Sequence, residues 1–272
     1  MVTLFFASAL LLYLAASGTL AASFAGGREM APRTGTAMAA GGVLLHGVGL
    51  AAFTARYAEL PLVGFAPSLC TLAFLIALFL FASTVTRESR TVGLVLLPFI
   101  ALLLAIALLV GVAPRGEPLA FLDFWLKIHV VLAFLGYAGL TVSFAAGLLY
   151  LLQFRELKGK RLGRVFRFFP SLPTLDRLGR RGLAIGFPSL TLALIIPSAW
   201  TIRFQHTFPA ADPQVIWGVL TWLTFAIVLL VRGRGSADAE RRGARASVIG
   251  FVVVVVAYVV LRLSMAVGGV FL

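Results

Sequence analysis

The feature that most constrains this chain is the recurrence of apolar runs about 20 residues long over almost its whole length. A helical run of about 20 residues spans the hydrocarbon core of a bilayer. The chain is 61% hydrophobic and 12% charged, whereas soluble domains are about 45–50% apolar and about 25% charged. We therefore predict an all-α, polytopic membrane helix bundle. A soluble enzyme, a disordered chain and a membrane β-barrel, whose strands alternate over about ten residues, are excluded.

Eight runs qualify as spans, and no boundary separates them into domains, so we expect a single transmembrane domain over residues 1–272. The predicted spans are about 3–24, 37–56, 65–85, 92–113, 125–153, 182–200, 214–231 and 247–270. The first run is longer than a signal-peptide core and has no basic segment before it, so we interpret it as a true helix.

Basic residues gather in alternate loops. In this topology, 18 of the 23 lysines and arginines lie on one side of the membrane, nine of them in a basic loop over 154–181. Because cytoplasmic loops carry an excess of Lys and Arg, we predict that this side is cytoplasmic. Both termini then lie outside, and the chain is a multi-pass protein of a bacterial inner (plasma) membrane. The excess of basic residues on one side and the attraction of such residues to anionic membrane lipid explain the net charge of +13. We therefore expect no nucleic-acid partner.

Few residues can support thiol, metal or acid–base chemistry. The single cysteine, Cys70, lies inside an apolar run, and there are only three histidines and ten acidic residues. The phosphate-binding loop, the nucleophile elbow and the zinc-protease motif are all absent from the sequence. We therefore predict no catalytic residue.

The three histidines are the candidate ligands. His46 lies near the middle of the second span, where a polar side chain usually faces the bundle interior. Neutral imidazole is a good ligand of haem iron, but a packed histidine bonded to a neighbouring helix is the alternative. His129 lies just inside the outer end of the fifth span, with Tyr137 about two turns deeper. It is either a ligand or an interfacial histidine that only caps or is solvated.

The outer end of the bundle offers further polar side chains. His206 lies in the short outer loop over 201–213, together with Arg203 and Asp212; it is either a ligand or simply solvated. Arg262 is the only formal charge deep in the last span. It either snorkels toward water or pairs with a carboxylate such as a haem propionate.

Several short fragments occur in a fixed order. They are Pro61-Leu62 with Ser68-Leu69, His129-Val130 with Tyr137, Gly186-Phe187-Pro188-Ser189-Leu190-Thr191, Trp200, Asp212-Pro213 with Trp217 and Trp222, and Gly250-Phe251 with Tyr258. In these fragments the chain resembles the cytochrome c assembly protein family. That family comprises integral-membrane haem-handling proteins, among them CcsA and the shorter HemX-like proteins.

The resemblance implies haem b as the cofactor. It implies that His129 is an outward-facing ligand of the haem iron and that His46 is an intramembrane ligand during haem passage, which makes these two histidines the predicted metal ligands. His206 would replace a lost second ligand, and Arg203 or Arg262 would hold the propionates. The full set of predicted haem-binding residues is His129, His46, His206, Arg262, Arg203, Trp200, Asp212 and Trp217.

The chain also departs from the family pattern. Gln205, Pro209 and Ala211 stand where the family has aromatic residues, and Leu230 stands where a second histidine is expected. The resemblance implies haem delivery to apocytochrome c or another assembly subunit, at most as the haem-presenting component of a cytochrome c haem lyase. The alternative is a HemX-like, non-catalytic regulator that binds a cytosolic haem-biosynthesis enzyme such as the glutamyl-tRNA reductase. A secondary transporter is disfavoured, because the spans lack acidic residues and broken helices.

Overall fold

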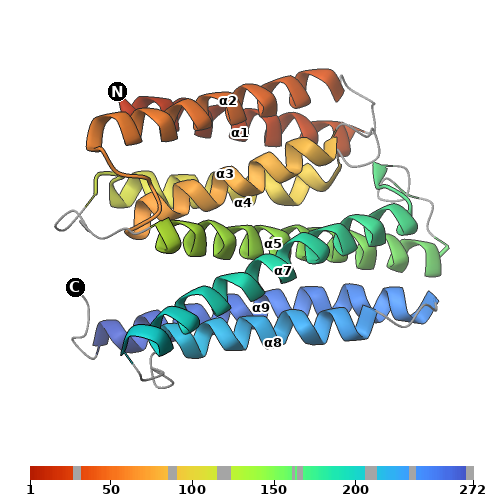
Figure 1. The fold of residues 1–272 in the computed structure, drawn as a ribbon. Coiled ribbons are helices and arrows are strands. Elements are labelled where there is room, and N and C mark those ends of the chain that lie inside the picture. Colours follow the sequence, from red (N-terminus) through yellow and green to blue (C-terminus); the bar gives the residue numbers. More distant parts are fainter. Residues whose placement is uncertain are drawn as a thin grey trace. The chain divides into compact units, whose positions relative to one another are not determined.

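A computed structural model describes residues 1–26, 32–84, 91–114, 124–160, 163, 168–205, 213–232 and 237–267. It leaves undescribed the side chains of residues 32–33, 83–84, 200–205, 213–214, 237 and 262–267. Within these ranges the regular structure is entirely helical (Figure 1), and eight helices are long and apolar enough to cross a membrane. The predicted fold class is therefore confirmed, and the protein is a multi-pass membrane protein.

The helices form two compact units. The first comprises Met1–Asp123 and Leu149–Leu178, and the second comprises Phe124–Leu148 and Gly179–Leu272. Helices of the first unit are α1 (Val2–Gly26), α2 (Pro32–Tyr57), α3 (Phe65–Thr84) and α4 (Gly93–Val110). The second unit contains most of α5 (Phe124–Lys158) and α7 (Leu172–Gln205), together with α8 (Pro213–Arg232) and α9 (Ala237–Val267).

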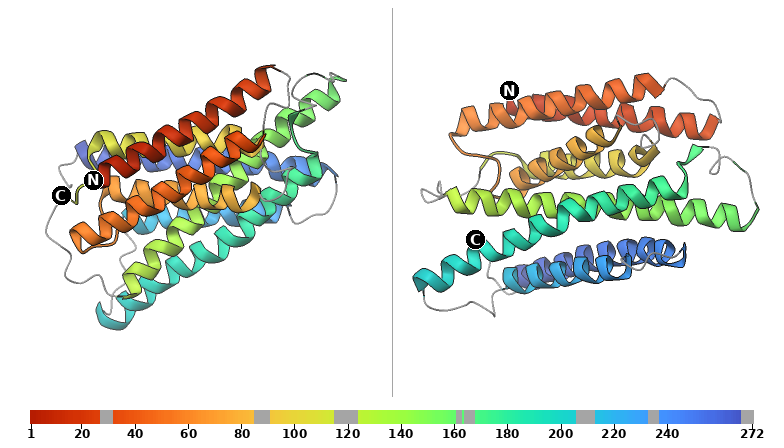
Figure 2. Two further views of the ribbon diagram at one scale, coloured as in Figure 1. Left: turned by 90° about the horizontal axis from the view of Figure 1, so that it is seen from above. Right: turned by 45° about the vertical axis from the view of Figure 1, so that its right-hand side comes forward.

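In the first unit, α1 packs along α2 and α4, and α3 packs along α4 and α2 (Figures 1 and 2). Aromatic side chains of α1 lie directly on glycines of α2. A Cβ atom added to Gly42 would lie 2.7 Å from the ring of Tyr13, and one added to Gly49 would lie 2.8 Å from the ring of Phe6. The absence of side chains at these two positions therefore allows the rings to be fully buried between the helices.

A structured turn connects α2 to α3. The Thr71 hydroxyl donates a hydrogen bond to the Pro61 carbonyl, and the Ser68 hydroxyl donates to the Leu62 carbonyl at 3.0 Å. Gly64 has a φ of +86°, in the region that favours glycine. These contacts attach the Pro61-Leu62 fragment to the first turns of α3.

In the second unit, glycines allow α5 and α7 to cross in close contact. A Cβ atom on Gly139 would overlap the Gly182 carbonyl oxygen and lie 2.8 Å from the Gly186 Cα atom. The helices α5, α7, α8 and α9 then share one apolar cluster. Its buried members are Leu140, Leu183, Leu190, Phe225, Val228 and Val254.

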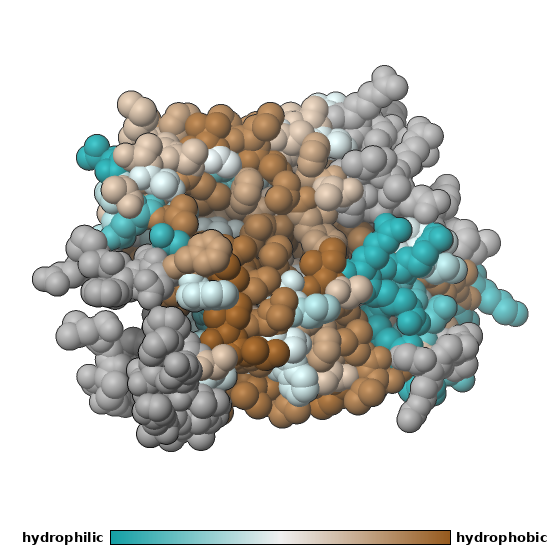
Figure 3. All heavy atoms as spheres, viewed as in Figure 1, coloured by the Kyte–Doolittle hydropathy of each residue, from teal (hydrophilic) through white to brown (hydrophobic). Residues whose placement is uncertain are grey.

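The outer surface of the helices is apolar, as a lipid environment requires. Leu109 is 87% exposed, and Leu102, Ile195 and Ile216 are each more than half exposed. Figure 3 shows apolar side chains covering most of the helix surface on the face in view. Helices α5 and α7 are longer than the predicted spans 125–153 and 182–200, and their additional turns carry charged residues. A helix can continue in this way beyond the bilayer. Parts of the segment 154–181 are accordingly helical.

Candidate functional site

His129 of α5 is half-buried and hydrogen-bonded to α7. Its Nδ1 atom lies 2.5 Å from the backbone carbonyl oxygen of Ala193. A carbonyl oxygen only accepts hydrogen bonds, so the Nδ1 atom must carry the proton and donate it. In neutral imidazole the lone pair is then on Nε2. Histidines that bind metals usually have this arrangement, with the non-ligating nitrogen donating to a carboxylate, a carbonyl or a water.

Trp217 of α8 lies against α5 at Tyr137, about two turns after His129. Its ring is 4.9 Å from the ring of Tyr137 and 5.3 Å from the ring of Tyr258 on α9. The Trp217 Nε1 atom is buried and makes no hydrogen bond to any described residue. A buried donor without a partner is destabilising. This indole N–H is therefore a donor still available to a ligand or a water molecule.

The neighbouring Trp222 differs in this respect. Its Nε1 atom donates a hydrogen bond to the Thr191 hydroxyl on α7 at 2.9 Å, and its ring stacks on Phe187 at 5.5 Å. The role of Trp222 is therefore structural, because it joins α8 to α7. Of the two tryptophans, only Trp217 retains an unused polar atom.

His46 of α2 belongs to the first unit, where it is fully buried. The rings of Phe6 and Phe74 contact it edge-on at 5.5 and 5.4 Å, and its Nδ1 atom lies 3.3 Å from the Tyr13 hydroxyl on α1. The buried Nε2 atom makes no well-formed hydrogen bond to the described residues, although the Cys70 backbone contacts the ring. This environment resembles that of a packed core histidine.

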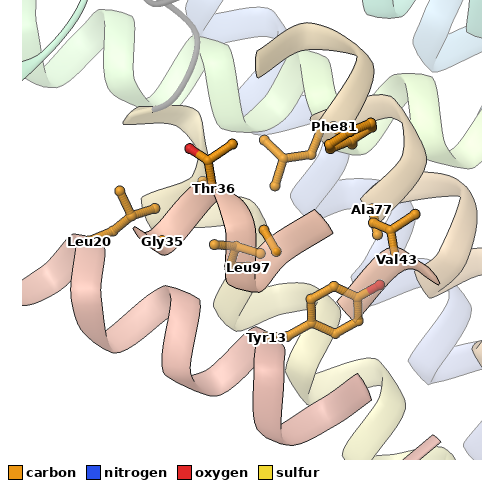
Figure 4. A pocket seen from close by; sticks show the side chains of 11 residues that line it. Tyr13, Leu20, Gly35, Thr36, Val43, Ala77, Phe81 and Leu97 are labelled. Atoms are coloured by element: carbon orange, nitrogen blue, oxygen red, sulfur yellow. The ribbon is translucent and has the colours of Figure 1, made fainter. Parts of the chain in front are cut away.

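A small pocket of the first unit is lined in part by Tyr13, the neighbour of His46 (Figure 4). Tyr13 lines it together with side chains from α2, α3 and α4, including Val43, Ala77 and Leu97. Its volume is about 30 Å³, which is room for about two water molecules. A porphyrin does not fit in a pocket of this size.

The remaining predicted residues belong to the end of α7 and the segments around it. His206 and Asp212 lie outside the described residues. Trp200 and Arg203 lie in the last two turns of α7, and Arg262 lies near the end of α9, but the structure does not describe their side chains. Among the described side chains, the structure thus places Trp217 against the helix that carries His129, and it places His46 in the other unit.

Two polar features of the second unit were not predicted. The first is the Ala193 carbonyl, which no residue-type pattern marks. The second is Arg232, which the sequence assigns to a loop but which lies in the last turn of α8 with only 2% of its surface exposed. Its Nη2 atom donates to the Ser247 hydroxyl at 3.0 Å. The side chain is enclosed because Gly179 and Gly243 present no Cβ atom to it.

A comparison with known protein families covers most of this chain. Residues 61–267 match the family model described as Cytochrome C assembly protein. The chain belongs to the cytochrome c assembly protein family. The match includes His129, Trp217 and the turn before α3, and it confirms the resemblance seen in the sequence.

Similar members of this family carry the name cytochrome c biogenesis protein CcsA. The chain is 33% identical to the one from Guillardia theta over 149 residues, covering 49% of each chain. It is 32% identical to the one from Chlamydomonas reinhardtii over 130 residues, covering 48% of this chain and 35% of that one. It is 29% identical to the one from Synechococcus sp. (strain JA-3-3Ab) over 269 residues, covering 76% of this chain and 77% of that one.

In the first two of these relatives, the matched segment spans half of the relative's length or less. The comparisons therefore show the family to which this chain belongs. None of the three relatives is named as a regulator, so the comparisons give no support to the HemX-like alternative.

Proposed function

We propose that this protein binds haem b and presents it to apocytochrome c or another assembly subunit at the outer face of a bacterial plasma membrane. The observation that supports the proposal best is the hydrogen bond from His129 Nδ1 to the Ala193 carbonyl. Because that bond uses Nδ1, the Nε2 lone pair of the neutral ring is available for iron. Family membership supplies the biological setting.

The described residues suit a haem. A histidine-ligated haem site combines an imidazole, apolar surface for the porphyrin faces, and polar groups for the propionates. His129 supplies the first, and the aromatic rings of Tyr137, Trp217 and Tyr258 supply apolar surface on adjoining helices. The unused indole N–H of Trp217 could donate a hydrogen bond to a propionate.

Each predicted residue has a role in this proposal. His129 would ligate the iron, with His206 as the second ligand, and Arg203 or Arg262 would hold the propionates. Trp200, Asp212 and Trp217 are the remaining residues that we propose to contact haem. His46 would ligate the iron only during passage through the membrane, since its packed surroundings leave no room for a porphyrin in this structure. When bound, haem would supply the vinyl groups across which the partner's cysteine thiols add to form thioethers, and the residues of this chain would hold and orient it.

The proposal includes the orientation deduced from the basic residues. With the segment 154–181 in the cytoplasm, His129 and the start of α8 lie at the outer ends of their spans. Haem bound there faces the compartment in which a secreted apocytochrome would be met.

The test is hemin binding by the purified full-length protein in detergent, measured by titration and by the pyridine haemochrome spectrum. We expect the unsubstituted protein to bind haem with a histidine-ligated Soret band and His129→Ala to lose most of it. His46→Ala is the parallel variant, and unchanged haem loading there would assign His46 to packing alone. A His129→Ala protein with full haem content and an unaltered Soret band would exclude this function for His129.

A further inference from the structure

The carbonyl that receives the His129 proton lacks its usual partner within the helix. In an α-helix, the carbonyl of residue 193 accepts a hydrogen bond from the N–H of residue 197. Residue 197 is proline, and it lies inside α7. Proline has no backbone N–H, and its ring also clashes with the carbonyl four residues earlier and displaces it. Pro197 therefore frees the Ala193 carbonyl from the helical hydrogen-bond pattern.

Water does not replace the missing donor well at this position. Ala193 is 1% exposed and faces the interior of the second unit. A buried carbonyl without a donor is destabilising. The His129 imidazole reaches this carbonyl from α5 at 2.5 Å, so it supplies the hydrogen-bond donor that the backbone nitrogen of Pro197 lacks.

We propose that Pro197 is a positioning residue for His129. By freeing the Ala193 carbonyl, Pro197 holds His129 as the tautomer with the proton on Nδ1 and directs the Nε2 lone pair away from α7. A proton donated to a carbonyl also makes the opposite nitrogen a stronger donor to a metal. This inference rests on the proposed function for its consequence, since the ring would be oriented toward haem iron.

The same helix contains a matched control. Pro188 also lies inside α7, and it removes the helical hydrogen bond to the carbonyl of Ala184. Residue 184 is an alanine, as is residue 193. His129 contacts Ala193 and not Ala184. Substituting Pro188 therefore changes the helix in the same chemical way without changing the partner of His129.

The experiment compares Pro197→Ala with Pro188→Ala in the full-length protein reconstituted in nanodiscs. The first readout is the tautomer of the free protein, from ¹⁵N chemical shifts of labelled histidine, with the His129 signal assigned by its loss in His129→Ala. We expect the Nδ1–H form in the unsubstituted protein and in Pro188→Ala. In Pro197→Ala the restored N–H competes for the carbonyl, so we expect a substantial Nε2–H population.

The second readout is hemin affinity. Loss of the partner of a metal-ligating histidine typically weakens metal binding about 10- to 100-fold, and we expect a loss of that size in Pro197→Ala. In the His129→Ala background, Pro197→Ala should cause no further loss, because Pro197 acts only through His129. An equal loss in both backgrounds would mean that Pro197 acts through the shape of α7, and the inference would be wrong.

The two proposals fail in different ways. If the unsubstituted protein binds no hemin, the proposed function fails, and the tautomer measurement still decides the structural relation between Pro197 and His129. If the unsubstituted protein binds hemin and Pro197→Ala leaves both the tautomer and the affinity unchanged, the inference fails and the proposed function stands.

Discussion

The Tyr13 hydroxyl of α1 and the Nδ1 atom of His46 on α2 lie 3.3 Å apart in the interior of the first unit. Two aromatic rings, Phe6 and Phe74, flank the imidazole, and no part of it is exposed. The pair is the polar centre of an otherwise apolar contact between α1, α2 and α3. Its hydrogen bond therefore contributes to stability whether or not His46 also meets haem.

We expect Tyr13→Phe to destabilise the protein by about 1 kcal/mol. Hydrogen bonds between membrane helices average about 0.6 kcal/mol, and a buried group left without a partner costs about 1–3 kcal/mol. Cys70 is the only cysteine in the sequence and is buried, so the reaction of a thiol-specific dye during heating reports unfolding. The control is Tyr57→Phe, at a half-buried ring that contacts Phe53. Equal melting temperatures for the two variants would contradict the expectation.

Gly139→Ala should destabilise the second unit. The new methyl group would overlap the Gly182 carbonyl and crowd the Gly186 Cα atom, both of which belong to the backbone of α7 and cannot rotate away. Overpacking of this kind costs about 1–3 kcal/mol. The control is Gly18→Ala in α1, where nothing lies within 4 Å of the added Cβ atom. Because alanine favours helix more than glycine does, Gly18→Ala should leave the thermal midpoint unchanged or raise it, and a fall equal to that of Gly139→Ala would refute the close crossing.

Ser247→Ala should weaken the contact between α8 and α9. The Ser247 hydroxyl accepts hydrogen bonds from Arg232 Nη2 and from Ser143, each at 3.0 Å, and donates to the Gly243 carbonyl. Its removal takes one partner from each of two buried donors, at about 1–3 kcal/mol for a group that is left unsatisfied. Ser189→Ala is the control, since that hydroxyl bonds only to Ile185 in an exposed setting. A melting curve followed by the fluorescence of Trp217 and Trp222, which lie in the same unit, should separate the two variants.

Substitution of the two tryptophans of α8 by phenylalanine should have opposite effects on stability and on hemin affinity. Trp217→Phe removes a buried N–H that has no partner among the described residues, so stability should be kept or improved. If that N–H serves a propionate, hemin affinity should fall at least about tenfold, because hydrogen bonds to charged groups contribute about 1.5–3 kcal/mol. Trp222→Phe breaks the bond to Thr191, so it should lower stability by about 1 kcal/mol with little effect on affinity. Hemin titration and melting of both variants check this pattern, and unchanged affinity in Trp217→Phe would exclude the propionate role.

The predicted orientation can be tested with single cysteines. In a Cys70→Ser background, a cysteine at Ala58 should react with a membrane-impermeant thiol reagent in intact cells, because the end of α2 is predicted to lie outside. A cysteine at Gly159, after the end of α5, should react only once the cells are opened. The opposite labelling pattern would mean that the positively charged loops face outward.

The fold class and the number of membrane spans could be predicted from the sequence, because the length and hydrophobicity of each helix are local properties of the chain. The sequence also marked His129 and Trp217 through their place in family fragments. The contacts that these residues make could not be predicted from the sequence. Whether the Ala193 carbonyl meets His129, whether Arg232 is enclosed by Gly179 and Gly243, and whether Gly139 lies on Gly182 all depend on which helices meet and at what register. Only the tertiary structure decides those pairings, since each joins side chains or backbone atoms that lie far apart along the chain.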